Sequence, residues 1–582
     1  ALQKLTPSFS SMTNGMGTTL SLNGLPDDYF IFLENGKRLY GDDTYARINV
    51  AKIKRIEILN GASSALYGTN AIGGVINIIT DDVKNAINVS SDTRYASKGR
   101  FTQSVNIDVN TGKFGSYTSY RRQQAEGWQL NPYEENSKTH ELEETGKVAS
   151  TGFYANTVNQ KFTFDATDKL SFYARGGYYD NKTRRPYEAY DYNILHETFN
   201  YGIGAQYMIN KGNYITADCY ADHFSSSYCF FKDNKTYNGK AGEEQVRKRT
   251  RNHNLSIKGI FKLGNRHKLS VGTEYIVDVL KSQTDNIAKE DAYTLALFAQ
   301  DEIKLLRNLQ ALIGVRYIYH ENFKNHATPN VALMYKPGKF NFRASYAAGF
   351  RTPTLSELYA TDIAKKNDRL TIGNLDLKPE KNNYFSLSAE YVHERFSVSV
   401  NAFYNNIRDM IDYNTIATGD KAMEQYGHKE VRQRDNIAEA KVHGINVSAN
   451  AYLGAGFNLS GGYTHLNTQD VELEQPIDKS IKNAYNINAQ WAHSWKIYRL
   501  NINYTGRFNS KRFSKSYGYA PEYQLWDLNT RHSFNLKSVI IEPGCGMENL
   551  FDYMDDRPYN SNYATLTPGR SFYISLSLKF KS

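Results

Sequence analysis

Long apolar runs are missing from this chain of 582 residues. No window holds the 18 or more apolar residues that a membrane-spanning helix needs, so a helical membrane protein is excluded. Mean hydropathy is −0.60, and hydrophobic residues make up 40% of the chain. A membrane β-barrel remains compatible with these values, because only every second residue of its strands faces lipid.

Cysteine and proline are scarce, with 3 Cys and 13 Pro. The cysteines Cys219, Cys229 and Cys545 match no zinc-binding spacing, so no metal site is expected from them. In an oxidising compartment, Cys219 and Cys229 would either form a disulfide or remain unpaired. The chain opens without a secretion signal, as a mature exported protein also would.

Charge of one sign is not concentrated anywhere. The net charge is +10, from 70 Lys and Arg against 60 Asp and Glu, and it is spread along polar segments. A nucleic-acid partner is not expected, because such proteins cluster their basic residues. No Gly-x-Ser-x-Gly motif or comparable nucleophile context occurs, so we do not expect an enzyme or catalytic residues.

Aromatic residues, by contrast, are abundant. The chain has 45 Tyr and 29 Phe. Membrane barrels place aromatic belts at both membrane interfaces. Composition alone is equally compatible with a soluble, aromatic-rich all-β protein.

The sequence divides into two regions. Residues 1–83 have short strands at 29–33, 53–59 and 74–80, with a two-residue hairpin signal at Asn35-Gly36. Residues 84–582 instead show long strands in which apolar and polar residues alternate, as at 342–350, 385–391, 396–402, 500–505 and 572–580. Period-two alternation places one set of side chains on each face of a sheet.

The connections in the second region alternate in length. Short turns at 336–339 and 453–456 are typical of the periplasmic side of such a barrel. Extracellular loops are typically long and polar, and such stretches occur at 122–150, 231–250, 352–380, 406–440 and 508–523. At roughly ten residues per strand plus connectors, this region fits about 22 strands. The predicted fold is therefore an all-β membrane protein, an antiparallel transmembrane β-barrel whose wide lumen needs an N-terminal plug.

Residues 53–80 carry the most specific motif. They include Arg55, Glu57, Gly61, Tyr67, Gly68, Gly73 and Gly74, and closely resemble the end of the plug domain of TonB-dependent outer-membrane receptors. Residues 548–552 with 568–572 resemble the C-terminal signature of the same family, and the alternating end Phe572–Phe580 resembles its assembly signal. The family's plug is longer, so the resemblance implies that part of it is missing from this chain.

The resemblance implies an integral protein of the bacterial outer membrane that imports a scarce nutrient. TonB would be its energy-coupling partner, outer-membrane lipids would surround it, and a surface lipoprotein partner stays open. Arg55 and Glu57 lie two residues apart on one strand face and Ile56 and Ile58 on the other. In the family, such charged plug residues meet charged residues of the barrel wall. A passive porin or structural barrel would lack residues like 53–80.

A paired loop motif concerns the ligand. Phe350-Arg351-Thr352-Pro353 and residues 373–380, with Asn374 and Leu377, resemble a motif of haem and cobalamin receptors, apart from Thr352 and Leu375. A plain strand end with a proline turn is the alternative. The resemblance places residues 37–45 at the apex of the plug. The expected ligand contacts are Tyr40, Asp42, Asp43, Tyr45, Arg351 and Tyr359.

Histidine is absent from residues 1–83 and 354–373, where haem receptors carry iron ligands. His428 and His443 are expected to be loop or lumen residues. The favoured ligand is therefore cobalamin or another corrinoid, with haem or an iron–siderophore chelate as alternatives. No cofactor is expected, although Asp180, Asn181, Asp191 and Asn193 offer calcium-type oxygen ligands within one predicted extracellular loop. A solvated turn is the favoured interpretation there.

Overall fold

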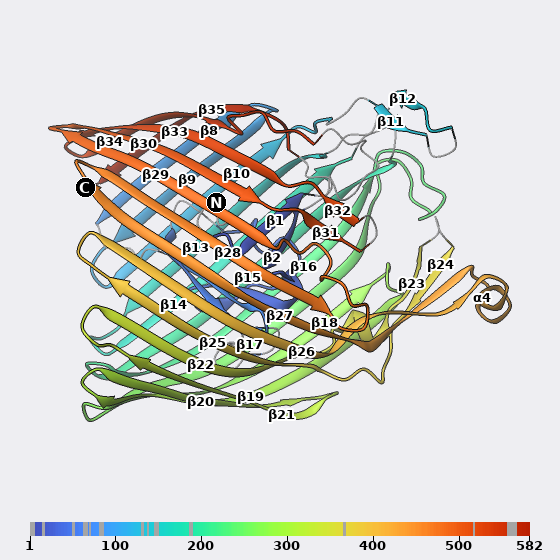
Figure 1. Ribbon diagram of the computed structural model, residues 1–582, viewed down its shortest axis with the longest axis horizontal. Helices are drawn as coiled ribbons and strands as arrows, with labels where there is room; N and C mark the ends of the chain where they lie inside the picture. Colours follow the sequence, from blue (N-terminus) through green and yellow to red (C-terminus); the bar gives the residue numbers. More distant parts are fainter. Residues whose placement is uncertain are drawn as a thin grey trace.

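In the computed structural model a closed β-barrel surrounds a small N-terminal domain, whose blue strands lie inside the lumen (Figure 1). The structure describes residues 6–13, 18–48, 53–61, 68, 71–80, 86–129, 133–136, 139–144, 150–185, 190–364, 368–515, 518–555 and 567–581. The predicted boundary between residues 83 and 84 lies outside these ranges.

Within the described ranges, 22 antiparallel strands close the barrel, which confirms the predicted fold class. The last strand pairs with the first, so the sheet has no free edge. The strands are β8 (Ile87–Ala96), β9 (Arg100–Asn110), β10 (Phe114–Ala125), β13 (Gly152–Asp165), β14 (Leu170–Arg184), β15 (Tyr192–Asn210), β16 (Asn213–Phe230), β17 (Glu244–Leu263), β18 (His267–Ser282), β19 (Ile287–Leu306), β20 (Leu309–His320), β21 (Lys324–Tyr335), β22 (Phe340–Arg351), β25 (Glu380–Val392), β26 (Phe396–Thr418), β27 (Glu430–Gly454), β28 (Phe457–Asp470), β29 (Asn483–Trp495), β30 (Tyr498–Asn509), β33 (Tyr523–Leu536), β34 (Val539–Glu548) and β35 (Ser571–Lys581).

The predicted two faces of the strands are present. Leu387 on β25 and Ile574 on β35 are each 66% exposed, and Val400 on β26 is 39% exposed. Ser577, between two exposed leucines of β35, is buried. Apolar side chains therefore point outward, which is the arrangement of a barrel whose outer face contacts lipid.

The N-terminal domain, hereafter the plug, contains two small sheets. One joins β1 (Phe9–Thr13), β2 (Thr18–Leu22) and β3 (Leu25–Pro26), and a short 3-10 helix, η1 (Asp27–Tyr29), follows. The other has the order β5 (Lys37–Arg38), β4 (Phe30–Glu34), β7 (Gly74–Thr80) and β6 (Ile53–Asn60). Strands β4 and β7 are nearly fully buried and pack against Ile56 and Ile58 of β6. The hairpin predicted at Asn35-Gly36 joins β4 to β5, with φ of 51° and 78° at its two residues.

The connections differ between the two ends of the barrel, as predicted. The long ones carry β11 (Tyr133–Glu135), β12 (Leu142–Glu144), α3 (Leu355–Tyr359), β23 (Thr361–Ala364), β24 (Arg369–Ile372), α4 (Gly419–Tyr426), β31 (Arg512–Ser514) and β32 (Gly518–Ala520). We call this end extracellular, since long loops lie there in outer-membrane barrels. No helix in the described part of the chain is long and apolar enough to cross a membrane.

Two loop predictions were wrong in extent. Residues 406–440 are mostly strand, because β26 and β27 stay paired far beyond the apolar band through several register shifts. Their polar alternation resembles a loop in sequence, since neither face is buried in lipid there. Likewise, β17 begins at Glu244, inside the loop predicted at 231–250.

The structure places the residues of two groupings that the sequence left open. Cys219 and Cys229 lie on the same strand, β16, roughly 33 Å apart at about 3.3 Å per residue, so they cannot form a disulfide, and both are free. Asp180 and Asn181 belong to β14 and Asn193 to β15, so the proposed calcium ligands do not share one loop. Among the described residues, no group of three or more His, Cys, Asp or Glu side chains is placed to hold a metal ion.

Candidate functional site

The apical loop of the plug, residues 37–48, leans against the inner wall formed by β14–β17. Lys37 forms an ion pair with Asp218. Arg47 donates from Nη1 to both carboxylate oxygens of Asp222, at 3.1 and 3.0 Å, and the backbone N–H of Tyr40 donates to the same carboxylate at 3.2 Å. Both Arg47 and Asp222 are buried, so these contacts fix the position of the loop.

Asp43 extends this polar contact toward the extracellular end. Its carboxylate is 2.8 Å from His196 Nδ1 and accepts a hydrogen bond from Asn181 at 3.1 Å. Burial opposes ionisation, but the hydrogen bonds from His196 and Asn181 hold the pKa of Asp43 below its ordinary value. Asp42 is exposed, 3.5 Å from Lys248 of β17. The loop thus presents Asp42 and holds Asp43 in the wall contact.

The two apical tyrosines are partly buried. Tyr40 lies beside Tyr220 of β16, with 6.4 Å between ring centroids, and the Arg38 guanidinium lies over its ring. Burial raises the pKa of Tyr40 to about 12. Tyr45 packs against the apolar core of the plug. The ligand contacts predicted for these four apical residues stay predictions.

The paired loop motif forms a buried ion-pair cluster. Arg351 donates to Glu357 of α3 at 3.0 Å and to Glu380 of β25 at 2.5 Å. Tyr29 of the plug donates to Glu380 at 3.2 Å, and the Arg351 guanidinium lies over the Tyr29 ring. Arg351 and Glu380 are 3% and 0% exposed. The motif therefore ties the plug, β22 and the start of an extracellular loop together.

The other residues of this motif also serve local structure. Phe350 stacks on His326, and Pro353 precedes the capping box that begins α3. The backbone N–H of Asn374 donates to the Glu357 carbonyl, while Leu377 is buried beside α3. Tyr359 packs on the same cluster. A ligand role for Arg351 or Tyr359 stays a prediction.

The plug motif differs from what the resemblance implied. Arg55 and Glu57 form an ion pair with each other at 2.7 Å, on an exposed face of β6. In the described part of the chain, the ion pairs between plug and wall come instead from the apical loop and from Glu34 of β4, which is 3.5 Å from Arg175. Gly61 lies against Tyr384 of β25, where an added Cβ would be 2.2 Å from the ring. Gly68 lies beside Arg316, Gly73 and Gly74 lie against Leu25 and Leu22, and Tyr67 is outside the described residues.

A cluster of aromatic rings and arginines, which the sequence did not reveal, lies at the extracellular mouth. The rings of Tyr192 and Tyr228 are stacked at 4.0 Å, and Tyr237 meets both rings edge-on. The Arg247 guanidinium lies 5.3 Å from the Tyr228 ring centroid and 4.9 Å from that of Tyr237. Arg185 similarly lies 4.9 Å from the centroid of Tyr192.

This mouth cluster borders an open hollow of about 640 Å³. Tyr237, Glu243, Arg247 and Lys248 line it, and its outer edge reaches Arg249 and Lys281. Lys248 is also 3.5 Å from Asp42, so one residue that lines the hollow contacts the plug apex. Cationic and aromatic side chains therefore line one side of the entrance to the lumen.

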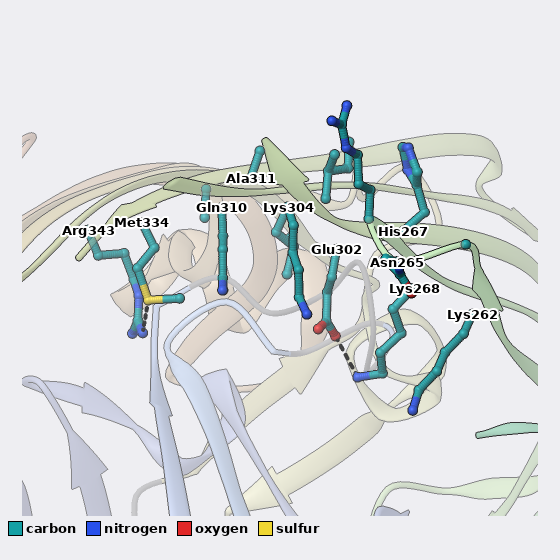
Figure 2. Close-up of a pocket in the computed structure, with 15 residues that line it drawn as sticks. Lys262, Asn265, His267, Lys268, Glu302, Lys304, Gln310, Ala311, Met334 and Arg343 are labelled. Carbon is teal, nitrogen blue, oxygen red and sulfur yellow. Dashed lines mark hydrogen bonds and ion pairs between the residues drawn. The ribbon is translucent and has the colours of Figure 1, made fainter. Parts of the chain in front are cut away.

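A second cavity, of about 580 Å³, lies at the end with the short turns. Figure 2 shows that Lys262, Lys268, Lys304 and Arg343 extend from its wall to the same side. Lys268 forms an ion pair with Glu302 at 2.9 Å. This cavity is at the far end of the lumen from the mouth cluster, so a ligand from outside would reach it last.

The two histidines considered as iron ligands lie apart. His428 follows α4 and is 2.9 Å from the Asp368 carboxylate. His443 is exposed on the outer face of β27, on the same side as Ile445, and so is not the lumen residue that was expected as one option. These two histidines do not form a pair of axial ligands.

Comparison with protein families gives two matches. The barrel model described as "TonB dependent receptor-like, beta-barrel" matches residues 99–542. The model described as "TonB-dependent Receptor Plug Domain" matches residues 1–75. The two matches together span nearly the whole chain.

Solved structures of similar fold include iron-uptake proteins. A ferric enterobactin receptor of Pseudomonas aeruginosa is 16% identical, with a TM-score of 0.84, over 100% of this chain and 99% of that one. The siderophore receptor PirA of Acinetobacter baumannii is 16% identical, with a TM-score of 0.80, over 98% and 94%. The FrpB iron transporter of Neisseria meningitidis is 14% identical, with a TM-score of 0.78, over 100% and 96%. At these identities the likeness shows the fold.

Proposed function

We propose that this chain, which belongs to the TonB-dependent receptor family of outer-membrane transporters and receptors, imports an anionic iron–siderophore chelate. Receptors of this family couple to TonB for energy. The proposal concerns the ligand, and it replaces the corrinoid as the favoured choice.

The observation that carries the proposal is the mouth cluster. Arg247 lies between Tyr228 and Tyr237, and Lys248 is close by. Guanidinium groups bind carboxylate and catecholate-type oxygens through charge-assisted hydrogen bonds. Tyrosine rings supply flat apolar contacts for an aromatic chelator. Ferric catecholate chelates are anionic and aromatic, so they complement both features.

The alternatives have less support. A corrinoid is held by polar contacts and has no need for a cationic entrance. Haem binding gains from axial coordination, and His428 and His443 are not placed to supply it as a pair. The similar structures that are described as siderophore receptors also favour an iron chelate as the ligand.

Ligand titration of the purified receptor tests the proposal. A ferric catecholate chelate, cyanocobalamin and haem are titrated in parallel, with quenching of tryptophan fluorescence as the signal. We expect the ferric chelate to bind most tightly. Arg247→Ala should weaken its binding roughly tenfold, since a partly desolvated cation–π contact with a charged ligand nearby contributes about 1–2 kcal/mol.

Arg395→Ala is the matched control. Arg395 is an exposed arginine in a short turn at the opposite end of the barrel, so its loss should leave the affinity unchanged. Tighter binding of cyanocobalamin than of any ferric chelate would reject the proposal and restore the corrinoid. An equal loss of affinity in the Arg247 and Arg395 variants would show that the mouth cluster is not the binding site.

A further inference from the structure

Cationic side chains gather on the inner wall of the barrel at the end with the short turns. Those that line the cavity of about 580 Å³ there include Lys262 of β17, Lys268 of β18, Lys304 of β19 and Arg343 of β22. Figure 2 shows that all four extend to the same side of the sheet. On β19, Lys304 shares its face with the buried Ala296 and Gln300, whereas Leu297 on the other face is 53% exposed. The four side chains therefore point into the lumen.

These four cations are poorly matched by carboxylates. Lys262 lies directly opposite Lys268 in the strand register, and like charges in that position destabilise a β-sheet. Among the described residues that line the cavity, Glu302 is the one acid, and it forms an ion pair with Lys268 at 2.9 Å. In the described part of the chain, Lys262, Lys304 and Arg343 form no ion pair with a carboxylate. An anion bound among them would supply the missing negative charge.

The strand register fixes the spacing of Lys304 and Arg343. Lys304 lies opposite Gln310 and Met334 opposite Arg343, and the pairing of Gln310 with Met334 completes one row across β19 to β22. Three strand spacings therefore separate the two cations by about 14 Å between Cα atoms. The Arg343 guanidinium donates to the Met334 thioether at 3.3 Å, which is a weak acceptor. The ammonium and the guanidinium can thus contact opposite edges of one bulky anion.

The shape of the wall strengthens the field of these exposed side chains. The Debye length in physiological salt is about 8 Å, so one solvated lysine alone attracts an anion weakly. A concave wall of low dielectric focuses the field of several cations. Glu390 on the adjoining strand β25 accepts a hydrogen bond from Asn341 at 2.8 Å. A cavity of about 580 Å³ also has the size of a small-molecule site, so it suits a compact anion that carries several charges.

A hydrophilic row on β17 connects the mouth cluster with this cavity. The inward residues of the strand are Lys248, Thr250, Asn252, Asn254, Ser256, Lys258, Ile260 and Lys262. Lys248 is 3.5 Å from Asp42 at the plug apex, and Lys262 lines the cavity. The row contains no acidic side chain. An anion that moves along β17 therefore meets no like charge on this strand.

The contacts of the plug favour an opening on this side of the lumen. Toward β14–β17 the plug is held by polar pairs such as Lys37 with Asp218, and water can replace such partners at small net cost. Toward β25–β28 it is held by buried apolar side chains such as Leu25 and Ile72, whose separation from the wall would expose apolar surface to water. A shift of the plug away from the polar sector therefore costs less and uncovers the row on β17.

We propose that the cavity lined by Lys262, Lys268, Lys304 and Arg343, hereafter the exit site, binds the imported anionic chelate before its release into the periplasm. This inference rests on the proposed function for the charge of the ligand. Ammonium and guanidinium groups form charge-assisted hydrogen bonds with catecholate and carboxylate oxygens. Because the exit site is open to water, each contact is weaker than a buried one, and the chelate can leave.

Lysine footprinting of the full-length receptor in detergent tests whether the exit site is occupied. The probe is a trianionic ferric tris-catecholate complex, and amine acetylation is followed by mass spectrometry. Saturating complex should slow acetylation of Lys268 and Lys304 at least about fivefold, since charge-assisted hydrogen bonds engage their ammonium groups. Lys336 and Lys339, which are exposed in a short turn at the same end, are the matched control and should react equally with and without the complex. Neutral cyanocobalamin should protect none of these lysines.

Arg247→Ala separates the exit site from the proposed function. It removes a cation of the mouth cluster, so at saturating complex the protection of Lys268 and Lys304 should persist. Protection of both lysines without cellular uptake of the complex would support the exit site and count against the proposed function. Uptake of the complex with both lysines unprotected would overturn the exit site and leave the proposed function standing.

Uptake by cells tests what the exit site contributes to transport. Lys268→Gln with Lys304→Gln should lower the maximal uptake rate about tenfold, since two charge-assisted contacts are lost, while the half-saturating concentration set at the mouth stays the same. Lys268→Arg with Lys304→Arg keeps both charges and should retain uptake, which separates charge loss from a folding defect. Lys336→Gln with Lys339→Gln should have no effect. An unchanged maximal rate in the first double variant, or an equal loss in the arginine double variant, would overturn the proposal.

Discussion

At the scale of single residues, the ion-pair cluster around Arg351 joins Glu357, Glu380 and Tyr29 in one network. One guanidinium satisfies Glu357 and Glu380, while Glu380 also accepts from Tyr29 of the plug and from the backbone N–H of Ile411. Burial opposes ionisation of Glu357, but Arg351 holds its pKa below the ordinary value. Each charge is compensated only while all members are present.

Removing the cation should therefore be costly. Arg351→Ala leaves Glu380 buried without its partner, and we expect a loss of about 3–5 kcal/mol in unfolding free energy. Arg55→Ala, which breaks an exposed ion pair, should cost at most about 1 kcal/mol. Urea unfolding of the receptor in detergent, followed by intrinsic fluorescence, measures both. Equal effects would show that the Arg351 cluster is not energetically special.

The sequence did not predict this cluster, although it drew attention to the motif. Tyr29 and Glu380 are 351 residues apart, and no local pattern indicates that they meet. The mouth cluster was missed for the same reason, since its rings come from β15, β16 and a loop. Resemblance located residues that matter, but only the fold shows whether they face a ligand or one another.

At the scale of elements, the plug sheet depends on glycine where strands cross closely. Gly74 has φ of 147°, and an added Cβ would be 2.4 Å from the Leu59 carbonyl oxygen and 2.8 Å from Leu22. Gly36 also has positive φ, at 78°, but nothing lies within 4 Å of its Cβ position. Alanine at Gly74 would therefore meet both steric overlap and backbone strain, whereas alanine at Gly36 would meet backbone strain alone.

Alanine at these two glycines should give different losses. Gly74→Ala should destabilise the plug by about 3 kcal/mol or more, because both strain and overlap act there. Gly36→Ala should cost about 1–2 kcal/mol from the backbone alone. Limited proteolysis of the folded receptor reports opening of the plug. Similar cleavage rates in the two variants would contradict the packing described for β7.

The outer and inner faces of the barrel strands can be tested in the same way. Val400→Arg on β26 should impair insertion by about 2–4 kcal/mol, because it places a charge on the lipid face. Ser399→Arg, one residue earlier, points to the lumen side and should be tolerated better. Urea-dependent folding into lipid vesicles measures both variants. Equal impairment would reject the assignment of faces.

Alternation in sequence predicted the elements well where lipid contact enforces it, as in β25, β26 and β35. It failed in the extracellular parts of β26 and β27, where neither face is buried in lipid and scattered apolar residues such as Ile407 and Ile411 do not alternate regularly with polar ones. The number of strands could be predicted from the length of the barrel region, because the barrel must close. The loop boundaries could not be predicted, since they depend on strand pairing beyond the membrane.

At the scale of the whole molecule, the plug contacts the barrel wall in two chemically different sectors. Toward β14–β17 the contacts are ion pairs and hydrogen bonds, such as Lys37 with Asp218 and Arg47 with Asp222. Toward β22 and β25–β28 they are mainly apolar, with Leu25, Tyr29 and Ile72 packed against the wall, and the Tyr29–Glu380 hydrogen bond adds a polar contact there. The polar sector lies beneath the mouth cluster, so the proposed entrance and the charged plug contacts are adjacent.

Uptake of a radiolabelled ferric catecholate chelate by cells that lack their own receptors is the most direct test of the proposed import. Cells expressing this protein should accumulate iron only when TonB is present, and Arg247→Ala should lower uptake at limiting chelate concentrations while Arg395→Ala leaves it unchanged. Iron accumulation that is the same without TonB would contradict the account. So would cells that accumulate labelled cobalamin but no iron from any chelate.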